Sequence, residues 1–106
     1  MKSAAGKAIR RQSAGIEAFD NYFAPKILRG APGAKVFLIL RNGGYRTHNV
    51  TIPDLHFSKD VPPGDIRYAQ ARFPAKGVIA FYCRFHRTSS GMIGSLEADP
   101  SIAAPK

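Results

Sequence analysis

The alternation of apolar and polar residues along the chain predicts short β-strands rather than helices. A period of two is typical of a strand with one buried face, and a short apolar run rich in β-branched and aromatic residues is typical of a strand in a core. No helical period longer than one turn is present, and strands do not alternate with helices. The segments that fit a strand are 15–19, 26–30, 34–42, 45–53, 66–73, 78–83 and 92–98.

Turn-forming residues separate these segments and indicate the fold class. The stretches "NYFAP", "GAPG", "NGG" and "PAKG" predict turns, and residues 54–65, rich in Pro, Gly and Asp, predict a loop. Strands separated by turns every 8–12 residues or so are typical of a β-sandwich or barrel. We therefore expect an all-β fold, a β-sandwich of about eight strands whose two sheets each bury one face.

The length of 106 residues predicts one domain. We expect a flexible basic arm over residues 1–14, the folded domain over 15–98 and a tail over 99–106. The longest apolar runs are far shorter than the ~18 residues of a membrane span, so we expect no membrane insertion. The N-terminus lacks the apolar centre of an intact secretory signal. We therefore expect either a protein that stays in the cytoplasm or a mature or truncated form.

The formal net charge of +9 raises the question of an anionic partner. Basic residues are scattered along the chain without a helical basic stripe or a nucleic-acid motif, so we expect no nucleic-acid binding. A cationic surface is either simply solvated or steers an acidic protein or an anionic membrane. The single cysteine excludes an intrachain disulfide, so stability must come from core packing or a metal.

The stretch "FYCRFHRTSSGMIG" concentrates the candidate chemistry of the chain. It contains Cys83, His86 and Met92, and His48 lies on a predicted strand earlier in the chain. Taken singly, such residues are more often core or surface residues than ligands. Two imidazoles, one thiolate and a weak axial thioether, however, form the trigonal ligand set of blue-copper electron-transfer sites. Zinc is the alternative metal, but zinc sites seldom use methionine.

These motifs resemble the cupredoxins, the small blue-copper proteins such as plastocyanin and pseudoazurin. The resemblance covers roughly residues 23–98 and rests on "APGAKVFLILRN", "THNVTIP" and "FYCRFHRTSSGMIGSL". It implies a Greek-key sandwich that binds one copper ion and transfers single electrons. By the resemblance, His48, Cys83 and His86 are the equatorial copper ligands and Met92 is the axial ligand. Asn49 is then expected to join the two ligand segments by hydrogen bonds.

Two positions stand apart from the family pattern. The loop between His86 and Met92 is one residue longer than is usual in plastocyanin-like sequences. Of the four ligands, Met92 is therefore the one whose distance from copper the sequence defines least. His56 matches no ligand position of the family, and we interpret it as a structural or exposed residue.

The expected function is that of an electron carrier that cycles between Cu(I) and Cu(II). Two alternatives stay open: a copper chaperone or storage domain, and a cupredoxin domain from a larger redox enzyme or membrane-anchored protein. We expect no enzymatic activity, because four protein ligands leave copper no open position for a substrate.

The expected partner is an acidic redox protein, such as a c-type cytochrome or an oxidoreductase. His86 is expected to be the electron port, with Phe85 and Met92 in an apolar rim and Arg84 and Arg87 beside it. These two arginines either steer the partner or are ordinary solvated charges. We further expect a monomer that works, in its mature form, in the periplasm or another extracytoplasmic space.

Overall fold

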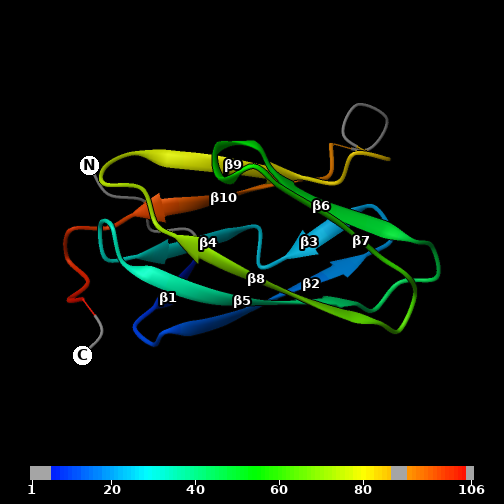
Figure 1. Cartoon of the computed structure of the whole chain (residues 1–106), viewed down its shortest axis with the longest axis horizontal. Coiled ribbons are helices and arrows are strands. Elements are labelled where there is room, and N and C mark those ends of the chain that lie inside the picture. The colour runs from blue at the N-terminus through cyan, green and yellow to red at the C-terminus, as the bar shows by residue number, and fades with distance from the viewer. Residues whose placement is uncertain (1–5, 87–90, 105–106) are drawn as a thin grey trace.

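The chain forms two β-sheets that pack as layers, as expected for a β-sandwich (Figure 1). The computed structural model describes residues 6–86 and 91–104, and these residues contain ten strands and no α-helix. The elements are β1 (Lys7–Ile9), β2 (Ser13–Phe19), β3 (Tyr22–Ala24), β4 (Ile27–Gly30), β5 (Lys35–Asn42), β6 (His48–Ile52), the 3-10 helix η1 (Pro53–Leu55), β7 (Phe57–Val61), β8 (Ile66–Arg72), β9 (Val78–Tyr82) and β10 (Ile93–Ala98).

The larger sheet has the strand order β1-β4-β10-β9-β6-β7, and the smaller sheet has the order β3-β2-β5-β8. In Figure 1, β9 and β10 lie in the upper layer, and β2 and β5 lie in the lower layer. Strand β6 pairs antiparallel with β9 at Thr51 and Tyr82. Because Tyr82 directly precedes Cys83, this pairing brings the strand of His48 beside the strand that leads to the cysteine.

The core between the sheets follows from the alternation in the sequence. In β5, the alternate residues Val36, Leu38 and Leu40 are at most 2% exposed. Phe81 of β9 and Phe23 of β3 come from opposite sheets, and their rings meet edge to face with 5.1 Å between centroids. This edge-to-face packing joins the layers and adds to the stability gained from burying both rings.

Three strands were not predicted from the sequence. Strand β3 lies where a turn was expected, β7 lies where a loop was expected, and β1 lies in the segment 1–14. Strands β1 and β7 are the two edges of the larger sheet, and β3 is an edge of the smaller one. Strands β1 and β3 have three residues each and β7 exposes three of its five, so none of them carries a clear alternation of buried and exposed positions.

The expectation of a flexible arm over 1–14 is wrong for its second part. Strand β1 pairs in parallel with β4, and Ile9 and Ala14 are buried in the core. The basic residues between them hid these two apolar positions. Residues 1–5 lie outside the described part of the chain.

The expected tail over 99–106 also begins as part of the folded structure. Asp99 is 2% exposed and pairs with Arg29 of β4, while Ile102 is 4% exposed. The Asp99 carboxylate also accepts hydrogen bonds from the hydroxyl and backbone N–H of Ser101. These contacts attach the segment after β10 to the end of the sandwich away from the cysteine.

We expect Asp99 to make stability depend on acid pH. The hydrogen bonds from Ser101, and then the bond from Arg29, lower the pKa of the Asp99 carboxyl below its ordinary value of 3.8. A lowered folded-state pKa stabilises the fold above the unfolded-state pKa, and this stabilisation is lost as the pH falls through the folded-state value. Asp99→Asn should therefore lower the melting temperature at pH 7 and reduce its fall below about pH 4. Exposed Asp54→Asn is the control, and equal acid profiles for both variants would contradict this role.

Candidate metal centre

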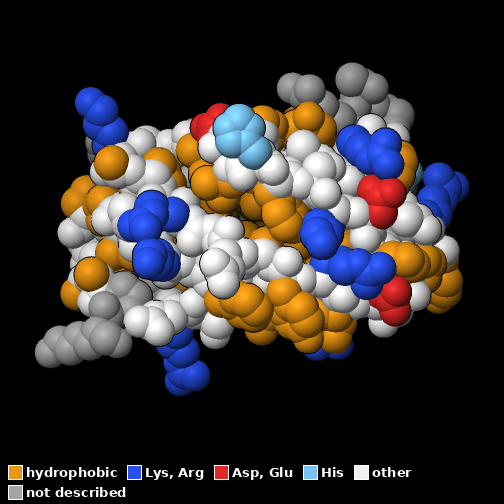
Figure 2. All heavy atoms as spheres, viewed as in Figure 1, with side chains coloured by type: hydrophobic (Ala, Val, Ile, Leu, Met, Phe, Trp, Pro, Cys, Tyr) orange, Lys and Arg blue, Asp and Glu red, His pale blue; other side chains and the backbone are white. Residues whose placement is uncertain are grey.

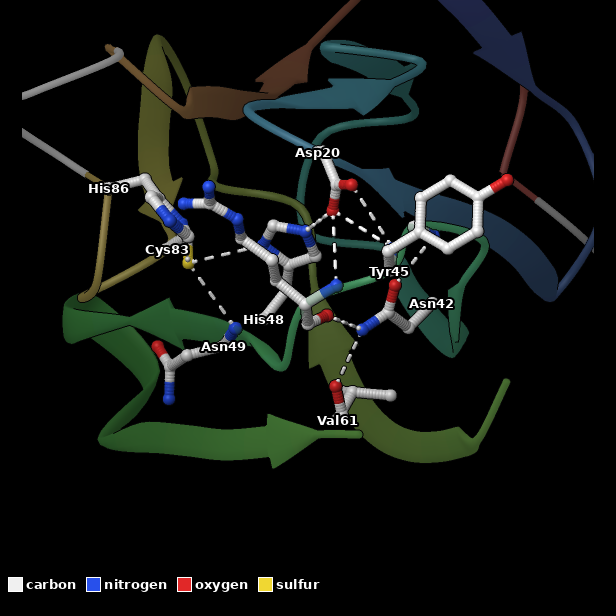
Figure 3. Close-up of polar contacts among 10 residues, drawn as sticks. Asp20, Asn42, Tyr45, His48, Asn49, Val61, Cys83 and His86 are labelled. Atoms are coloured by element: carbon white, nitrogen blue, oxygen red, sulfur yellow. Dashed lines mark hydrogen bonds and ion pairs between the residues drawn. The ribbon is translucent and has the colours of Figure 1, made fainter. Parts of the chain in front are cut away.

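Three potential ligand atoms converge at one end of the sandwich (Figure 3). His48 begins β6, Cys83 directly follows β9, and His86 lies in the loop that leads toward β10. The Cys83 Sγ lies 3.9 Å from His48 Nδ1 and 3.5 Å from His86 Nδ1. All three ligand atoms lie within 4.8 Å of one another. Residues separated by up to 38 positions in the sequence thus form one compact donor set.

The spacing of these atoms fits a single metal ion. Metal bonds of about 2.0–2.3 Å, as thiolate and imidazole make to zinc, place ligands in a trigonal plane about 3.5–4.0 Å apart. The two measured Sγ–Nδ1 separations agree with this value. Thiolate with two imidazoles also suits copper. The residues therefore fit the metal that the sequence predicts, on the geometry of the protein alone.

Met92 is 1% exposed and packs in the same core as Cys83. Its backbone N–H donates to the carbonyl of His86, and its carbonyl accepts from the N–H of Cys83. The N–H of His86 in turn donates to the Cys83 carbonyl. These bonds join the two ends of the loop whose extra residue was noted in the sequence. The extra residue falls within residues 87–90, which lie outside the described part of the chain.

Asn49 joins the two ligand segments, as predicted. Its backbone N–H donates to Cys83 Sγ at 3.3 Å, and its side-chain oxygen accepts from the backbone N–H of Arg84 at 3.3 Å. Its side-chain nitrogen donates to Asp60 and Ser58 of β7. The asparagine is fully buried, so these bonds replace those that water would make. Through its backbone and its side chain, Asn49 therefore holds the Cys83 segment beside β6, the strand that begins with His48.

Asp20, which sequence reasoning missed, holds the other side of the His48 ring. It lies between β2 and β3, and its Oδ1 is 3.0 Å from His48 Nε2 (Figure 3). Its carboxylate also accepts the backbone N–H groups of Tyr45 and Arg46. The hydrogen bond from His48, followed by that from Tyr45, lowers the pKa of the Asp20 carboxyl. No motif marks this residue, which is 28 positions from its partner.

His86 is the partly exposed member of the group, whereas His48 and Cys83 are fully buried. Removal from water lowers the pKa of His86 below its ordinary value of 6.5, and electrostatic repulsion from His48, in its protonated form, and from Arg46 lowers it further. A lowered pKa favours the neutral ring, which is the form that binds a metal. The rings of His48 and His86 lie 5.1 Å apart between centroids.

Exposed apolar side chains occur around this end of the molecule. Tyr45, just before the His48 strand, is 93% exposed, while Phe85 and Ile93 flank the loop and are 43% and 45% exposed. Arg84 pairs with Asp60 at 3.1 Å and lies over the Phe85 ring. Its charge is thus partly neutralised within the protein. Arg87 lies outside the described residues.

His56 takes no part in this group. It follows η1 with a left-handed backbone, φ 53°, and is exposed. Its exposure agrees with its interpretation as a structural or exposed residue.

Comparison with known proteins identifies the family. The model of the cupredoxin-like domain matches residues 1–93. The chain therefore belongs to the cupredoxin family, the class that the two-layered fold and the His-Cys-His group define. No curated protein sequence matches the chain.

Several solved structures have the same fold. Reduced auracyanin from the photosynthetic bacterium Roseiflexus castenholzii has a TM-score of 0.70 at 17% identity, covering 84% of this chain and 98% of its own. The purple cupredoxin from Nitrosopumilus maritimus has a TM-score of 0.58 at 22% identity, covering 81% and 99%. The metal-binding domain of the Cu(I)-exporting ATPase CopA from Streptococcus pneumoniae D39 has a TM-score of 0.68 at 12% identity, covering 90% and 92%. At these identities the similarities establish the fold and leave the function to be argued from the site.

Within the described residues, no helix is long and apolar enough to cross a membrane.

Proposed function

We propose that this protein is a mononuclear copper protein that carries single electrons between redox partners. The observation that carries the proposal is the convergence of His48, Cys83 and His86, whose ligand atoms lie within 4.8 Å of one another, with two of the three residues fully buried. These three residues are proposed as the equatorial ligands, and Met92 as the axial ligand. Copper would supply the one-electron exchange between Cu(II) and Cu(I).

The protein would hold the copper ligands in fixed positions and provide a surface residue through which the electron leaves. His48 is held by Asp20, Cys83 is held by Asn49, and the ends of the His86 loop are joined by backbone hydrogen bonds. Such fixed ligands change little between oxidation states, which favours rapid transfer. His86 is the ligand that reaches the surface, so we propose it as the electron port, with exposed Phe85 beside it.

A copper-handling role is the second candidate, favoured by the similarity to the metal-binding domain of the Cu(I) exporter. A chaperone or storage domain must release its copper, whereas an electron carrier must retain it in both oxidation states. A cupredoxin domain of a larger redox enzyme or anchored protein is a further alternative. The structural similarity to a chain of a heme-copper terminal oxidase, with a TM-score of 0.70, supports its consideration.

The test is a titration of the protein with Cu(II), followed in the visible spectrum. One equivalent should produce an intense thiolate-to-copper charge-transfer band, which ascorbate should bleach and a mild oxidant should restore. Zinc is the control metal and should produce no colour. A colourless copper complex would contradict the electron-transfer proposal, and a band that is lost with the metal on each reduction would favour copper delivery.

Met92 should tune the centre rather than retain the metal. An axial thioether is a long, weak ligand, so Met92→Leu should leave copper bound and raise the reduction potential. Spectroelectrochemistry of the two proteins measures the shift. Loss of copper from the Leu variant would instead show that Met92 is a principal ligand.

We propose that the partner presents an acidic face, because the chain carries a formal charge of +9 and Arg46 lies close enough to His86 to act on its pKa. On the face shown in Figure 2, basic side chains occur toward both ends of the molecule, and acidic ones are few. The proposal includes a monomer that works outside the cytoplasm.

The electron-transfer rate with an acidic redox protein should fall on the order of tenfold as salt rises from low to physiological strength. Arg46→Gln should flatten this dependence. Arg84→Gln should have a smaller effect, because Asp60 already neutralises that guanidinium. Lys76→Gln, beyond the opposite end of β9, is the control. If the rate depends on salt equally in the Arg46 variant and the unaltered protein, Arg46 does not steer the partner, and docking would rest on the exposed apolar residues Tyr45, Phe85 and Ile93.

A further inference from the structure

The contacts of the Asp20 carboxylate set it apart from an ordinary surface charge. It accepts hydrogen bonds from the His48 ring at 3.0 Å, from Tyr45 N–H at 3.0 Å and from Arg46 N–H at 3.2 Å. The last two donors belong to the segment that leads directly into the His48 strand. One carboxylate therefore fixes both the ring and the chain that carries it.

The segment also approaches Asp20 closely enough to require a glycine. A Cβ atom built on Gly44 would overlap Asp20 Oδ1 and lie 2.9 Å from the backbone nitrogen of Asp20. The backbone N–H of Gly44 in turn donates to the buried side chain of Asn42, which also donates to the Arg46 carbonyl. Asn42 is 1% exposed, so the loop is anchored from inside the sandwich as well.

The hydrogen bond assigns the proton of the His48 ring. An ionised carboxylate can only accept, so Nε2 must be the nitrogen that carries hydrogen. The neutral ring then presents a lone pair at Nδ1, the atom that faces Cys83 Sγ. A carboxylate on the far nitrogen also makes the ligating nitrogen more basic and places negative charge near the metal.

On the basis of the proposed copper function, we infer that Asp20 is a positioning residue that presents His48 Nδ1 to copper and lowers the reduction potential by favouring Cu(II). A negative charge stabilises the more positive oxidation state more strongly than the less positive one. The carboxylate should therefore contribute more to Cu(II) affinity than to Cu(I) affinity. A merely structural role would change both affinities equally and leave the potential where it is.

The test compares Asp20→Asn with Asp54→Asn, which makes the same charge change at an exposed position beyond the other end of β6. Asp20→Asn should lower Cu(II) affinity about 10- to 100-fold, lower Cu(I) affinity less and raise the potential, while keeping the charge-transfer band. Asp54→Asn should change none of these. An unchanged potential in Asp20→Asn, with copper bound, would overturn the role of Asp20 alone. Failure of the unaltered protein to bind copper would overturn the proposed function and this inference with it.

A second variant reaches the same carboxylate without altering it, should Asp20→Asn fold poorly. Gly44→Ala should displace the carboxylate and raise the reduction potential, as Asp20→Asn does. Gly15→Ala should leave the potential unchanged, because a Cβ added there makes only an ordinary contact at 3.9 Å. Nitrogen-15 NMR of the copper-free protein supplies a reading that does not depend on the metal. It should show hydrogen on His48 Nε2, and hydrogen on Nδ1 instead would overturn the inference.

Discussion

Cys83→Ser should abolish the visible charge-transfer band of the copper-loaded protein completely. The chain has no other thiol, and Sγ is central to the group, within 3.9 Å of both imidazole Nδ1 atoms. Serine is nearly the same shape, but its hydroxyl is a poor ligand for copper. Loss of residues that merely support a ligand costs 10- to 100-fold in affinity, so loss of the ligand should cost more than about 100-fold. Visible absorption and competition with a copper chelator measure the two effects.

The fold of the Cys83→Ser variant should persist, which makes the result interpretable. The backbone N–H of Asn49 can donate to the new hydroxyl as it does to sulfur. We expect a destabilisation of about 1–3 kcal/mol from burying a more polar group. Circular dichroism and thermal melting check this. Retention of an intense band would contradict the assignment of the cysteine as a copper ligand.

Phe81→Ala should destabilise the fold by about 3–5 kcal/mol, a large part of the 5–15 kcal/mol typical of a domain. Phe81 is fully buried, meets Phe23 edge to face and fills the space over Gly94 in the neighbouring strand. Its removal leaves a cavity between the sheets two residues before Cys83. Urea unfolding of the copper-free protein measures the change.

Val78→Ala is the matched control for this variant, because Val78 lies in the same strand and is 60% exposed. It should change the free energy of unfolding by no more than about 0.5 kcal/mol. Similar losses in both variants would show that strand propensity, rather than packing between the sheets, governs the contribution of β9. The Phe81 variant should also bind copper less tightly, since Cys83 belongs to the same buried cluster.

The fold class could be predicted from the amino-acid pattern alone, and so could the group of residues on which the copper proposal rests. The all-β sandwich and the cupredoxin family are confirmed. Segments such as β5 and β8 were predicted because each buries alternate residues, and this period is visible in a continuous stretch. The spacing of Cys83, His86 and Met92 was also visible, because these residues lie within one continuous stretch of ten residues. Their roles as ligands remain predictions.

Only the tertiary structure revealed the strands β1, β3 and β7. Strands β1 and β3 have three residues each, and three of the five residues of β7 are exposed, so none of them shows the alternation that marks β5 and β8; their pairing depends on backbone groups of a partner strand. Strand β1 shows this most clearly: it pairs in parallel with β4, and its register cannot be read from three residues with one buried side chain. The burial of Asp99 and Ile102 likewise depends on Arg29 and the core, which lie far away in the sequence.

Asp20 separates most sharply what the sequence determines from what the structure decides. A lone aspartate after a strand is an ordinary turn residue, and nothing in its neighbourhood marks it as a partner of His48. The two meet because the turn after β2 and the loop before β6 lie at the same end of the sandwich, where Gly44 permits a close approach. Ligand types follow from residue chemistry, which the sequence states directly. The proton position and charge around those ligands follow from contacts between distant segments, which exist only once both sheets have packed.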